Sequence, residues 1–559
     1  MTRQPERGVR HRWPSRPVVV RARWAGGAAA ALAVAWLIQR AGFPAAAAAV
    51  AGTTALVIAF AVGLFAVQAA LGGRSGITSV ARTVVDEAIR MRSPLVLVIL
   101  LAATLPVLPL LLDPDERLAY RLQFLIGWTL GGAGLLLGLL TIFLACGSIC
   151  GDIESGRIHM TLAKPLRRWE YLVGKWLGIL LYDLLLVVLV GAGSYTLVQM
   201  LAVDSAADAA DRDAVSRQVL VARRSLAPGP DRPQEYAAAI DAAITQLERD
   251  DPDAVGQEPD RVRRRIRREY ERRWHTVTPD METTFVFSGL GGAADPGREV
   301  QLQVEPRVSN VDVDLADVRF AVWLNGRPWP MEEGVHRDLT LPSRARHVLD
   351  LPNDVIGEAD TLRVRIANRN LVPPGETRPT AITFPPGDGM QVYVKAGSFE
   401  GNLLRCLALM WAKLALVAAV AVVAAAVFDL PSAILATLVF YATALGSEFF
   451  QDALGVYNVV GESGWERAAS RIGFAAGFFQ AGRFYEGFRM LLGFLADGVL
   501  AVLPSFAADA AISRLATGMM IPVRDVLWRL VLFVGLYPAV VGLLGWTIFD
   551  RRDLIRSSS

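Results

Sequence analysis

Cysteine is scarce in this chain, with three among 559 residues. The long polar region from Ala202 to Glu400 contains none, which excludes a disulfide framework there. Cys146, Cys150 and Cys406 lie in or beside apolar runs. The one-turn spacing of Cys146 and Cys150 permits a metal or redox pair, but no histidine accompanies them. Small apolar residues at a helix end are the favoured interpretation.

Motifs for catalysis and nucleotide binding are also missing. The five histidines are scattered without metal-ligand spacing, and no G-x-S-x-G elbow occurs. No G-x-x-x-x-G-K-[ST] phosphate loop occurs either. The Gly174-Lys175 pair is followed by Trp176, where the motif requires a magnesium-binding hydroxyl. The sequence therefore predicts that the chain is not an enzyme by itself and that it binds no cofactor of its own.

Apolar residues, in contrast, are abundant. They make up 53% of the chain, while 20% of the residues are charged, and this mixture predicts an integral membrane protein with a large part in water. The net charge of +3 is small, and no basic face of a nucleic-acid-binding module is evident, so no nucleic-acid partner is expected. Residues 1–23 hold seven Arg against one acid, Glu6, which predicts a basic tail retained in the cytoplasm.

Long apolar runs indicate the expected fold class, an α-helical polytopic membrane protein in the lipid bilayer. A helix needs about 20 apolar residues to cross the hydrocarbon. An N-terminal hairpin is expected over 24–72, with a cleaved signal peptide as the alternative for its short, Ala-rich first run. Six core spans are expected in the segments 94–201, 401–450 and 524–559, at about 94–112, 122–147, 176–201, 403–428, 431–450 and 524–548.

The apolar run 487–506 is weaker as a span, because it contains Asp497, Pro504 and two glycines. The basic C-terminal stretch predicts a cytoplasmic end, so an odd number of crossings must follow the outer region. We therefore expect a re-entrant or outer-surface element within 451–523, which leaves about eight spans in total. A ninth span is the alternative.

The stretch from Gly76 to Arg92 has an amphipathic pattern. Val80, Val84 and Ala88 share one helical face, while charged residues follow one another on another face. Segment 73–93 is therefore expected to form a helix that lies flat on the inner membrane surface.

Residues 202–400 are expected to form an extracytoplasmic α+β domain. The part 202–281 is charged and helix-prone, whereas 282–400 alternates apolar and polar residues and predicts an antiparallel β-sandwich. Eight Arg lie between Arg261 and Arg273. A helix that packs its apolar stripe on the sandwich with solvated Arg elsewhere is favoured over contact with anionic headgroups or an acidic ligand.

Two ionisable residues, Asp183 and Lys413, lie inside apolar runs. Such groups are costly in hydrocarbon and usually face a bundle interior or an aqueous path, which makes them a candidate intramembrane polar site. Pairing of the two and snorkelling of either to an interface are both open.

A charged stretch, Gly151 to Lys175, separates two apolar runs. Its five basic residues outnumber three acids, and short loops rich in Lys and Arg stay in the cytoplasm. The order "DIESGRIHMTLAKPLRRWEYLVGKWLG" resembles the loop between the second and third core spans of type-2 ABC exporter permeases. "TVVDEAIRMRSPLVLVIL" and "YPAVVGLLGWTIFDRRDL" resemble that family's surface helix with its first core span and its C-terminal end. The resemblance covers about residues 76–202 and 403–556.

The resemblance implies a permease subunit of an ABC transporter that acts as a homodimer or with a similar permease. The loop 148–175 would be its coupling element, in contact with a separate ATPase that carries ATP and Mg²⁺. Eight residues are placed in that element by the resemblance: Glu154, Ser155, Gly156, Arg157, Pro165, Arg167, Arg168 and Lys175. Arg157 stands where the family usually has Thr, and the N-terminal hairpin and the outer domain are additions to the six-span core.

Export of an unidentified substrate across the cell (inner) membrane of a bacterium is the function that the resemblance implies. Both termini are expected in the cytoplasm. The alternative is a membrane-anchored sensor, scaffold or force-transmitting ABC component whose outer domain binds a protein or glycan without solute transport.

Overall fold

The computed structural model describes the greater part of the chain. The described residues are 33–34, 36–40, 44–73, 75–90, 99–101, 103–104, 107, 116–157, 167–203, 209–250, 259–279, 281–290, 300–308, 317–352, 360–370, 380–447, 472–473, 475–480, 482–488, 490–491, 506 and 510–551. The expected tail 1–23, Pro165 and most of the segments 94–112 and 451–523 lie outside these residues.

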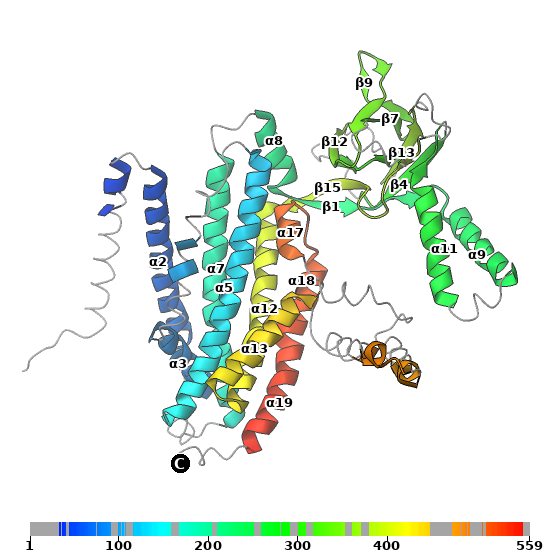
Figure 1. Cartoon of the computed structure of the whole chain (residues 1–559). Helices are drawn as coiled ribbons and strands as arrows, with labels where there is room; N and C mark the ends of the chain where they lie inside the picture. The colour runs from blue at the N-terminus through cyan, green and yellow to red at the C-terminus, as the bar shows by residue number, and fades with distance from the viewer. Residues whose placement is uncertain are drawn as a thin grey trace, which may run out of the picture.

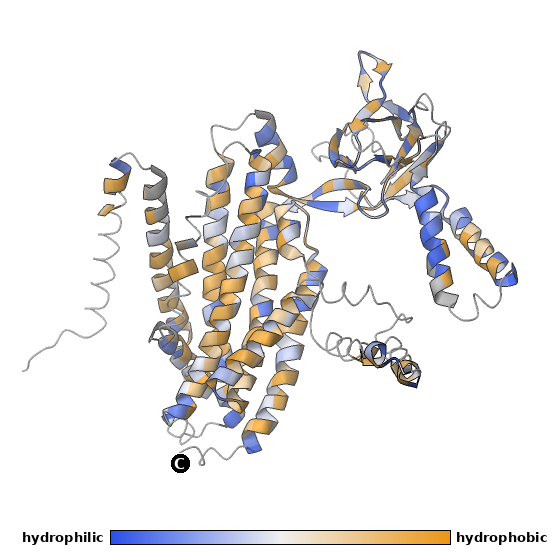
Figure 2. Cartoon of the chain, viewed as in Figure 1, coloured by the Kyte–Doolittle hydropathy of each residue, from blue (hydrophilic) through white to orange (hydrophobic). Residues whose placement is uncertain are grey.

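Five helices of the described chain are long and apolar enough to cross a membrane. They are Val50–Ala70, Leu118–Glu154 (α5), Arg168–Ala202 (α7), Phe399–Val427 (α12) and Val523–Arg551, which ends in α19 (Tyr537–Arg551). A further apolar helix, α13 (Leu430–Leu445), is shorter. Figure 1 shows α5, α7, α12, α13 and α19 as one bundle, and Figure 2 shows apolar residues along most of its length. These helices support a multi-pass α-helical membrane protein.

The helical elements of this part have the following bounds: α2 (Pro44–Ala70), α3 (Gly76–Arg90), α5 (Leu118–Glu154), α7 (Arg168–Ala202), α8 (Ala209–Gln218), α12 (Phe399–Val427), α13 (Leu430–Leu445), α17 (Ala511–Ala516), α18 (Val523–Leu530), the π-helix η4 (Val531–Leu536) and α19 (Tyr537–Arg551). α5 extends beyond the expected span 122–147 at both ends. Its charged last turn contains Gly151 but stays helical as far as Glu154.

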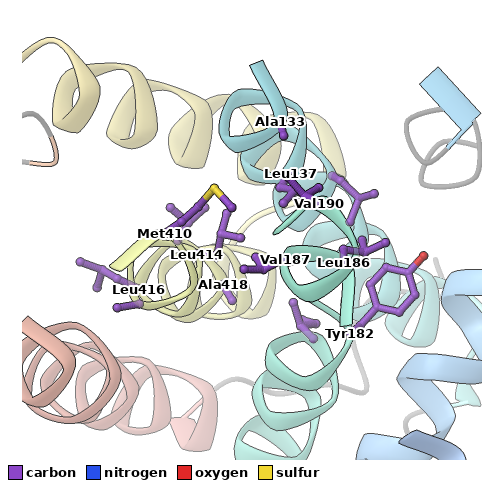
Figure 3. Close-up of a cluster of buried hydrophobic side chains, with 14 of the residues drawn as sticks. Ala133, Leu137, Tyr182, Leu186, Val187, Val190, Met410, Leu414, Leu416 and Ala418 are labelled. Atoms are coloured by element: carbon purple, nitrogen blue, oxygen red, sulfur yellow. The ribbon is translucent and has the colours of Figure 1, made fainter. Parts of the chain in front are cut away.

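The three central helices pack through complementary large and small side chains. Leu137 of α5, Leu186 of α7 and Leu414 of α12 are buried in one apolar cluster (Figure 3). A Cβ atom at Gly191 of α7 would lie only 2.2 Å from Cδ1 of Leu407 on α12. Small residues at such contacts let helix backbones approach closely, and the resulting van der Waals packing is one of the forces that associate helices in lipid.

A separate β-rich region follows α8. Its strands are β1 (Val221–Leu226), β2 (Gly229–Pro230), β3 (Thr276–Val277), β4 (Glu282–Ser288), β5 (Val300–Val304), β6 (Arg307–Val308), β7 (Asp317–Leu324), β8 (Arg327–Trp329), β9 (Met331–Glu332), β10 (Val335–His336), β11 (Leu339–Pro342), β12 (His347–Leu351), β13 (Thr361–Asn368), β14 (Ile382–Thr383) and β15 (Met390–Ser398). One sheet has the order β1-β15-β5-β12 and a second has the order β11-β7-β13-β4-β2. The smaller sheets are β3-β14-β6 and β10-β9.

Both large sheets contribute to one hydrophobic core. Leu302 and Val392 of the first sheet and Phe285, Phe320 and Val364 of the second are buried in the same cluster. The alternation of apolar and polar residues therefore predicts which face of each strand is buried as well as the strand itself, because successive side chains of a strand point to opposite sides.

The β-rich region is joined to the bundle at the end opposite the α5–α7 turn (Figure 1). β15 ends at Ser398 and α12 begins at Phe399, so strand and helix are continuous. The Ser398 hydroxyl accepts a hydrogen bond from the Gly401 amide at 3.3 Å and caps the helix. The Asp211 carboxylate of α8 accepts a bond from the Leu118 amide at 2.6 Å, at the start of α5.

Helices α9 (Pro233–Asp250) and α11 (Pro259–Trp274) project from the β-rich region as a pair (Figure 1). The Trp274 ring lies 5.3 Å from that of Phe285 in the β-rich core and 6.1 Å from that of Tyr236 on α9. Arg263 forms an ion pair with Glu248 across the two helices at 3.4 Å. The apolar stripe of α11 thus contacts α9 as well as the sheet.

His275, directly after α11, predicts a pH effect on the stability of this region. Its ring packs between Trp274 and Phe285, and burial lowers its pKa from 6.5 to about 4. The unfolded chain binds a proton near pH 6.5, whereas the folded region does so only near pH 4, so stability should fall as the pH drops between these values. We expect a loss on the order of 1–2 kcal/mol, measured by thermal unfolding at several pH values. His275→Phe should abolish this loss, and an unchanged pH dependence in that variant would contradict the assignment.

Candidate functional site

The connection between α5 and α7 is shorter than the expected loop 148–175, because α5 continues to Glu154 and α7 begins at Arg168. We use the name α5–α7 turn for its described residues, 155–157 and Arg167. Ser155 follows as the C-cap residue, and its amide donates to the Gly151 carbonyl at 3.0 Å. Gly156 has φ of +66°, a left-handed conformation that glycine adopts without a steric penalty and that commonly ends a helix.

Several residues that the resemblance placed in the coupling element lie on the surface of this turn. Glu154, Ser155, Arg157 and Arg167 are exposed. Pro165 falls outside the described residues. The carboxylate of Glu154 and the guanidinium groups of Arg157 and Arg167 can therefore contact a partner surface that carries both basic and acidic residues.

The start of α7 is fixed to the last helix of the bundle. The Arg168 guanidinium donates to the carbonyl oxygens of Phe549 and Asp550, each at 2.9 Å. The Arg167 amide donates to the Glu170 carboxylate at 2.9 Å, which satisfies one free donor at the helix start. The end of α5, the start of α7 and the end of α19 therefore meet beside the turn (Figure 1).

Lys175 differs from the other predicted residues because its side chain is 1% exposed. Its Nζ atom lies 2.8 Å from Oδ2 of Asp152 on α5 and 3.2 Å from Oε2 of Glu87 on α3. It also donates to the Ser148 carbonyl at 3.2 Å. Lys175 thus joins α3, α5 and α7 from within, whereas the resemblance placed it in the coupling element 148–175.

We call Glu87, Asp152, Lys175, Arg157 and Tyr171 the charge cluster. The Tyr171 hydroxyl donates to Asp152 Oδ2 at 2.9 Å. Arg157, on the exposed turn, lies 3.9 Å from the Glu87 carboxylate and 4.0 Å from that of Asp152. Burial raises the pKa of Glu87 above its ordinary value of 4.5, while the Lys175 charge lowers it. The cluster connects the exposed turn to the interior through two carboxylates that Arg157 and Lys175 share.

Two glycines of α7, one turn apart, allow α3 to pack closely against it. A Cβ atom at Gly174 would lie 2.7 Å from Val80 Cβ, and one at Gly178 would lie 2.6 Å from the Ala81 carbonyl oxygen. Val80, Ala81 and Val84 of α3 are buried, as the amphipathic pattern predicted for two of them. The apolar face of α3 therefore packs on another helix of the bundle.

The two ionisable residues expected inside the membrane have different partners. Asp183 is fully buried, and the Thr141 hydroxyl lies 2.9 Å from its Oδ2 atom. Lys413 donates to the Phe506 carbonyl oxygen. The structure thus does not bring Asp183 and Lys413 together as a pair.

Sequence reasoning did not assign a role to Glu87, Asp152 or Tyr171. The pattern of α3 carries one usable signal, because Glu87 directly precedes Ala88 at the edge of the apolar face. An acid at this edge predicts a buried basic partner. That partner is Lys175, which lies 88 positions further along the sequence, and no local pattern reveals such a contact.

Residues 129–222 match the family model described as ABC-2 family transporter protein. The matched segment contains most of α5, the turn, α7 and α8, and therefore the Lys175 and Asp152 side of the charge cluster. Comparison with curated proteins and with solved structures gives no match. The resemblance to type-2 ABC exporter permeases is confirmed over these residues.

Proposed function

From the ABC-2 family transporter domain, we propose that this chain is the membrane permease subunit of an ABC transporter. It couples ATP hydrolysis by a separate ATPase to export of a substrate. The observation that carries this proposal is the charge cluster directly behind the exposed α5–α7 turn. A generic connecting loop has no need of a buried lysine shared by two carboxylates from different helices, since burial of such charges is costly unless they are paired.

The proposed mechanism begins at the exposed turn, where Glu154, Arg157 and Arg167 contact the ATPase. Movement of the turn passes through Arg157 to the carboxylates of the cluster. Through Lys175 it reaches α3, α5 and α7 together. Arg168 transmits it to α19. The four helices thus move as one unit at this end of the bundle.

We further propose the finer architecture that the sequence suggested. The chain has about eight spans, with both termini and the α5–α7 turn in the cytoplasm. The β-rich region lies outside the cell membrane as a β-sandwich, which agrees with its attachment at the opposite end of the bundle. Two copies, or this chain and a similar permease, form the transmembrane unit beneath which two ATPase subunits, with ATP and Mg²⁺, are bound.

Variants of the exposed turn test the coupling role. Glu154→Ala should weaken co-purification of the ATPase and lower ATP turnover by about tenfold or more, because a charged contact at an interface is worth on the order of 2 kcal/mol or more when it is buried on binding. Membrane abundance should be normal, since Glu154 is exposed and no apolar segment is altered. Full ATPase association and turnover in this variant would show that the turn is only a connector.

Gly156 offers a second test. A Cβ atom at Gly156 has no neighbour within 4 Å among the described residues, so no contact inside the described chain requires a glycine there. The constraint comes from its φ of +66°. Gly156→Val should therefore distort the turn and reduce coupling, whereas Gly156→Asn should retain it, because Asn tolerates this conformation. Equal loss of ATP turnover in both variants would exclude the backbone explanation.

A second candidate function, force transmission from the β-rich region, is favoured by a separate observation. The segment 517–521 before α18 is held by the base of the β-rich region. The Arg223 guanidinium of β1 donates to the Thr517 carbonyl at 2.9 Å, and the Met520 amide donates to the Arg223 carbonyl at 2.7 Å. The Asn402 side chain of α12 bonds both the Met519 carbonyl and the Ile521 amide at 2.8 Å.

We call these contacts of Arg223 and Asn402 with 517–521 the root clamp. Because α18 leads through η4 into α19, and Arg168 holds α19, the clamp gives a continuous path from the β-rich region to the α5–α7 turn. Binding of a protein or glycan to the β-rich region would change the conformation of the α5–α7 turn along this path. In the opposite direction, motion of the ATPase would move the β-rich region. Vesicles that contain the complex and hydrolyse ATP without accumulating any solute would favour this alternative.

A further inference from the structure

Asp183 of α7 is a fully buried acid that the proposed coupling mechanism does not use. Its Oδ2 atom lies 2.9 Å from the hydroxyl oxygen of Thr141 on α5. Leu137 of α5 and Leu186 of α7 lie about one helical turn from this contact and are buried too (Figure 3). The carboxyl group is therefore enclosed in the apolar packing of α5 on α7, with a hydroxyl beside one of its oxygens.

The other carboxyl oxygen, Oδ1, is buried and has no hydrogen-bond partner among the described residues. An ionised carboxylate has two acceptor oxygens with about four lone-pair positions. In this structure the single hydrogen of the Thr141 hydroxyl is the one that reaches them. Burial of an ionised carboxylate is costly unless it is both paired and hydrogen-bonded, and a group without such partners takes up a proton instead.

The nearest cation along α7 is already used. Lys175 lies eight residues before Asp183, which is about 12 Å along a helix that rises 1.5 Å per residue. Its ammonium group is shared by Asp152 and Glu87, at 2.8 and 3.2 Å. Lys175 therefore belongs to the charge cluster and does not neutralise Asp183.

The helices packed against α7 supply no charge to Asp183 either. They are α2, α3, α5, α12 and α19, and α2 has no ionisable side chain. The ionisable side chains that the structure describes on the others are Arg82, Asp86 and Glu87 of α3; Tyr120, Arg121, Cys146, Cys150, Asp152 and Glu154 of α5; Glu400, Arg405, Cys406 and Lys413 of α12; and Tyr537, Asp550 and Arg551 of α19. None of them forms a hydrogen bond or ion pair with Asp183. Tyr182, beside it on α7, packs its ring against Phe60 of α2, with the ring centres 6.1 Å apart.

Thr141 forms a hydrogen-bonded chain that is complete when Asp183 carries a proton. Its Oγ1 atom lies 2.8 Å from the Leu137 carbonyl oxygen and 2.9 Å from Asp183 Oδ2. A hydroxyl has one hydrogen, so it donates to one of these oxygens at a time. If it donates to Leu137, its oxygen accepts from a protonated Oδ2, and both contacts are hydrogen bonds. With an ionised carboxylate, one of the two contacts has no hydrogen between its oxygens.

We propose that Asp183 Oδ2 is a proton-binding site inside the bundle, occupied at neutral pH while α5 is packed on α7. The proton exchanges with water when the two helices separate, because the carboxyl group is 0% exposed in the packed arrangement. Protonation therefore favours the packed conformation and ionisation the separated one, so their equilibrium depends on pH. The site is a property of this chain and does not require the ATPase of the proposed function.

Infrared spectroscopy of the purified full-length chain in lipid bilayers at neutral pH tests for the proton directly. A protonated carboxyl group has a carbonyl stretching band that an ionised carboxylate lacks. The unaltered chain should show this band, and Asp183→Asn should lose it. Asp525→Asn is the matched control, because Asp525 of α18 is exposed to solvent, and this variant should keep the band.

A second variant leaves the acid in place and removes the oxygen that accepts its proton. Thr141→Val should shift the Asp183 band, since the carboxyl group loses its hydrogen bond. Thr129→Val is the matched control, because Thr129 is also buried on α5 but its hydroxyl donates to the Leu125 carbonyl at 2.7 Å. It should leave the band unchanged.

Unfolding in micelles at several pH values measures the linkage between the proton and the fold. The unfolded chain loses the Asp183 proton above about pH 4, whereas the folded chain keeps it, so the folded state binds more protons and its stability falls as the pH rises. The unfolding equilibrium constant of the unaltered chain, divided by that of Asp183→Asn, should rise about tenfold per pH unit until the folded chain also releases the proton. Other titrating groups are common to both chains and cancel in this ratio.

A spectrum of the unaltered chain without a protonated-carboxyl band at neutral pH would overturn the proposal, whether or not any variant folds. A band that remains in Asp183→Asn, or that is the same in Thr141→Val and Thr129→Val, would overturn the assignment of the proton to Oδ2. A ratio of unfolding constants that does not change with pH would exclude the linkage to folding. If the band and the ratio behave as expected but the chain never co-purifies with an ATPase, the proposed function fails and the proton site stands.

Discussion

Replacement of Lys175 by methionine is expected to destabilise the protein by about 3–5 kcal/mol, the usual cost of removing one partner from a buried ion pair. The ammonium group is 1% exposed and lies within 3.2 Å of both Asp152 and Glu87. Its loss leaves two carboxylates at the α3–α5–α7 junction without their shared cation. The Tyr171 hydroxyl still donates to Asp152, whereas among the described residues Glu87 keeps only the exposed Arg157 guanidinium, at 3.9 Å.

The measurement is unfolding of the purified chain in mixed micelles with increasing denaturing detergent, together with the amount of protein in membranes. Arg157→Met is the matched control. It removes a cation that lies 3.9 Å from Glu87, but its side chain is 59% exposed, so a change below about 1 kcal/mol is expected. A triple variant with Lys175→Met, Glu87→Gln and Asp152→Asn should recover much of the lost stability, because no charge is then left buried.

An unfolding midpoint of Lys175→Met equal to that of the unaltered chain would contradict the charge cluster as a structural element. Equal losses in Lys175→Met and Arg157→Met would show that exposure does not govern the effect. A loss in Lys175→Met that the triple variant does not recover would assign the destabilisation to packing of the lysine chain.

The long apolar helices that the structure describes were largely predictable from sequence, but their ends were not. The absence of charge between Leu122 and Cys146 predicted α5, because such a run satisfies its polar backbone only as a helix in lipid. Asp152 and Glu154 suggested a loop instead. Their helical state depends partly on Lys175, which lies on another helix and neutralises Asp152. Charge alone therefore placed the helix end too early.

The candidate site was predictable only in part for the same reason. Glu154, Gly156 and Arg167 were found from local order in the sequence, and the structure places them at or beside an exposed turn, where a partner role stays a prediction. Lys175 belonged to the same motif but is internal. Motif order does not reveal which side of a helix a residue faces when its partner, Glu87, comes from another element.

The β-rich region was also predictable only in part. Alternation predicted β5, β7 and β13, since one face of each strand is buried in a core. The direct passage from β15 into α12 at Ser398 and Phe399 was not predicted, because the expected outer domain ended at 400 and the expected span began at about 403. The root clamp could not be predicted at all, because Arg223 and Thr517 are separated by 294 positions.

The root clamp leads to the second large expected effect. Arg223→Met should destabilise the junction by about 3 kcal/mol, since a buried, multiply hydrogen-bonded cation is lost. Arg223 is 8% exposed, donates to Gln301 Oε1 at 2.7 Å and to the Gln218 carbonyl at 3.1 Å, and stacks over the Tyr393 ring at 4.6 Å. Arg224→Met is the matched control, because Arg224 follows on the same strand but is exposed.

Gly518 tests the clamp from its other side. Its φ is +67°, and a Cβ atom there would lie 2.1 Å from the Gln218 carbonyl oxygen, so Gly518→Ala cannot be accommodated without moving backbone. Both Arg223→Met and Gly518→Ala should release the segment 517–521 from β1. The prediction therefore does not depend on the charge of one side chain.

Spin labels on cysteines at Ser225 and Leu527, both exposed, would report the distance between the base of the β-rich region and α18. The labelled chain without a further substitution and the labelled Arg224→Met variant should each give one narrow distance distribution. Arg223→Met and Gly518→Ala should broaden it, because 517–521 no longer follows β1. If the distribution stays narrow in both variants while unfolding shows a loss of stability, the junction is held by β15 and α12 alone, and the path from the β-rich region to α19 through the root clamp does not exist.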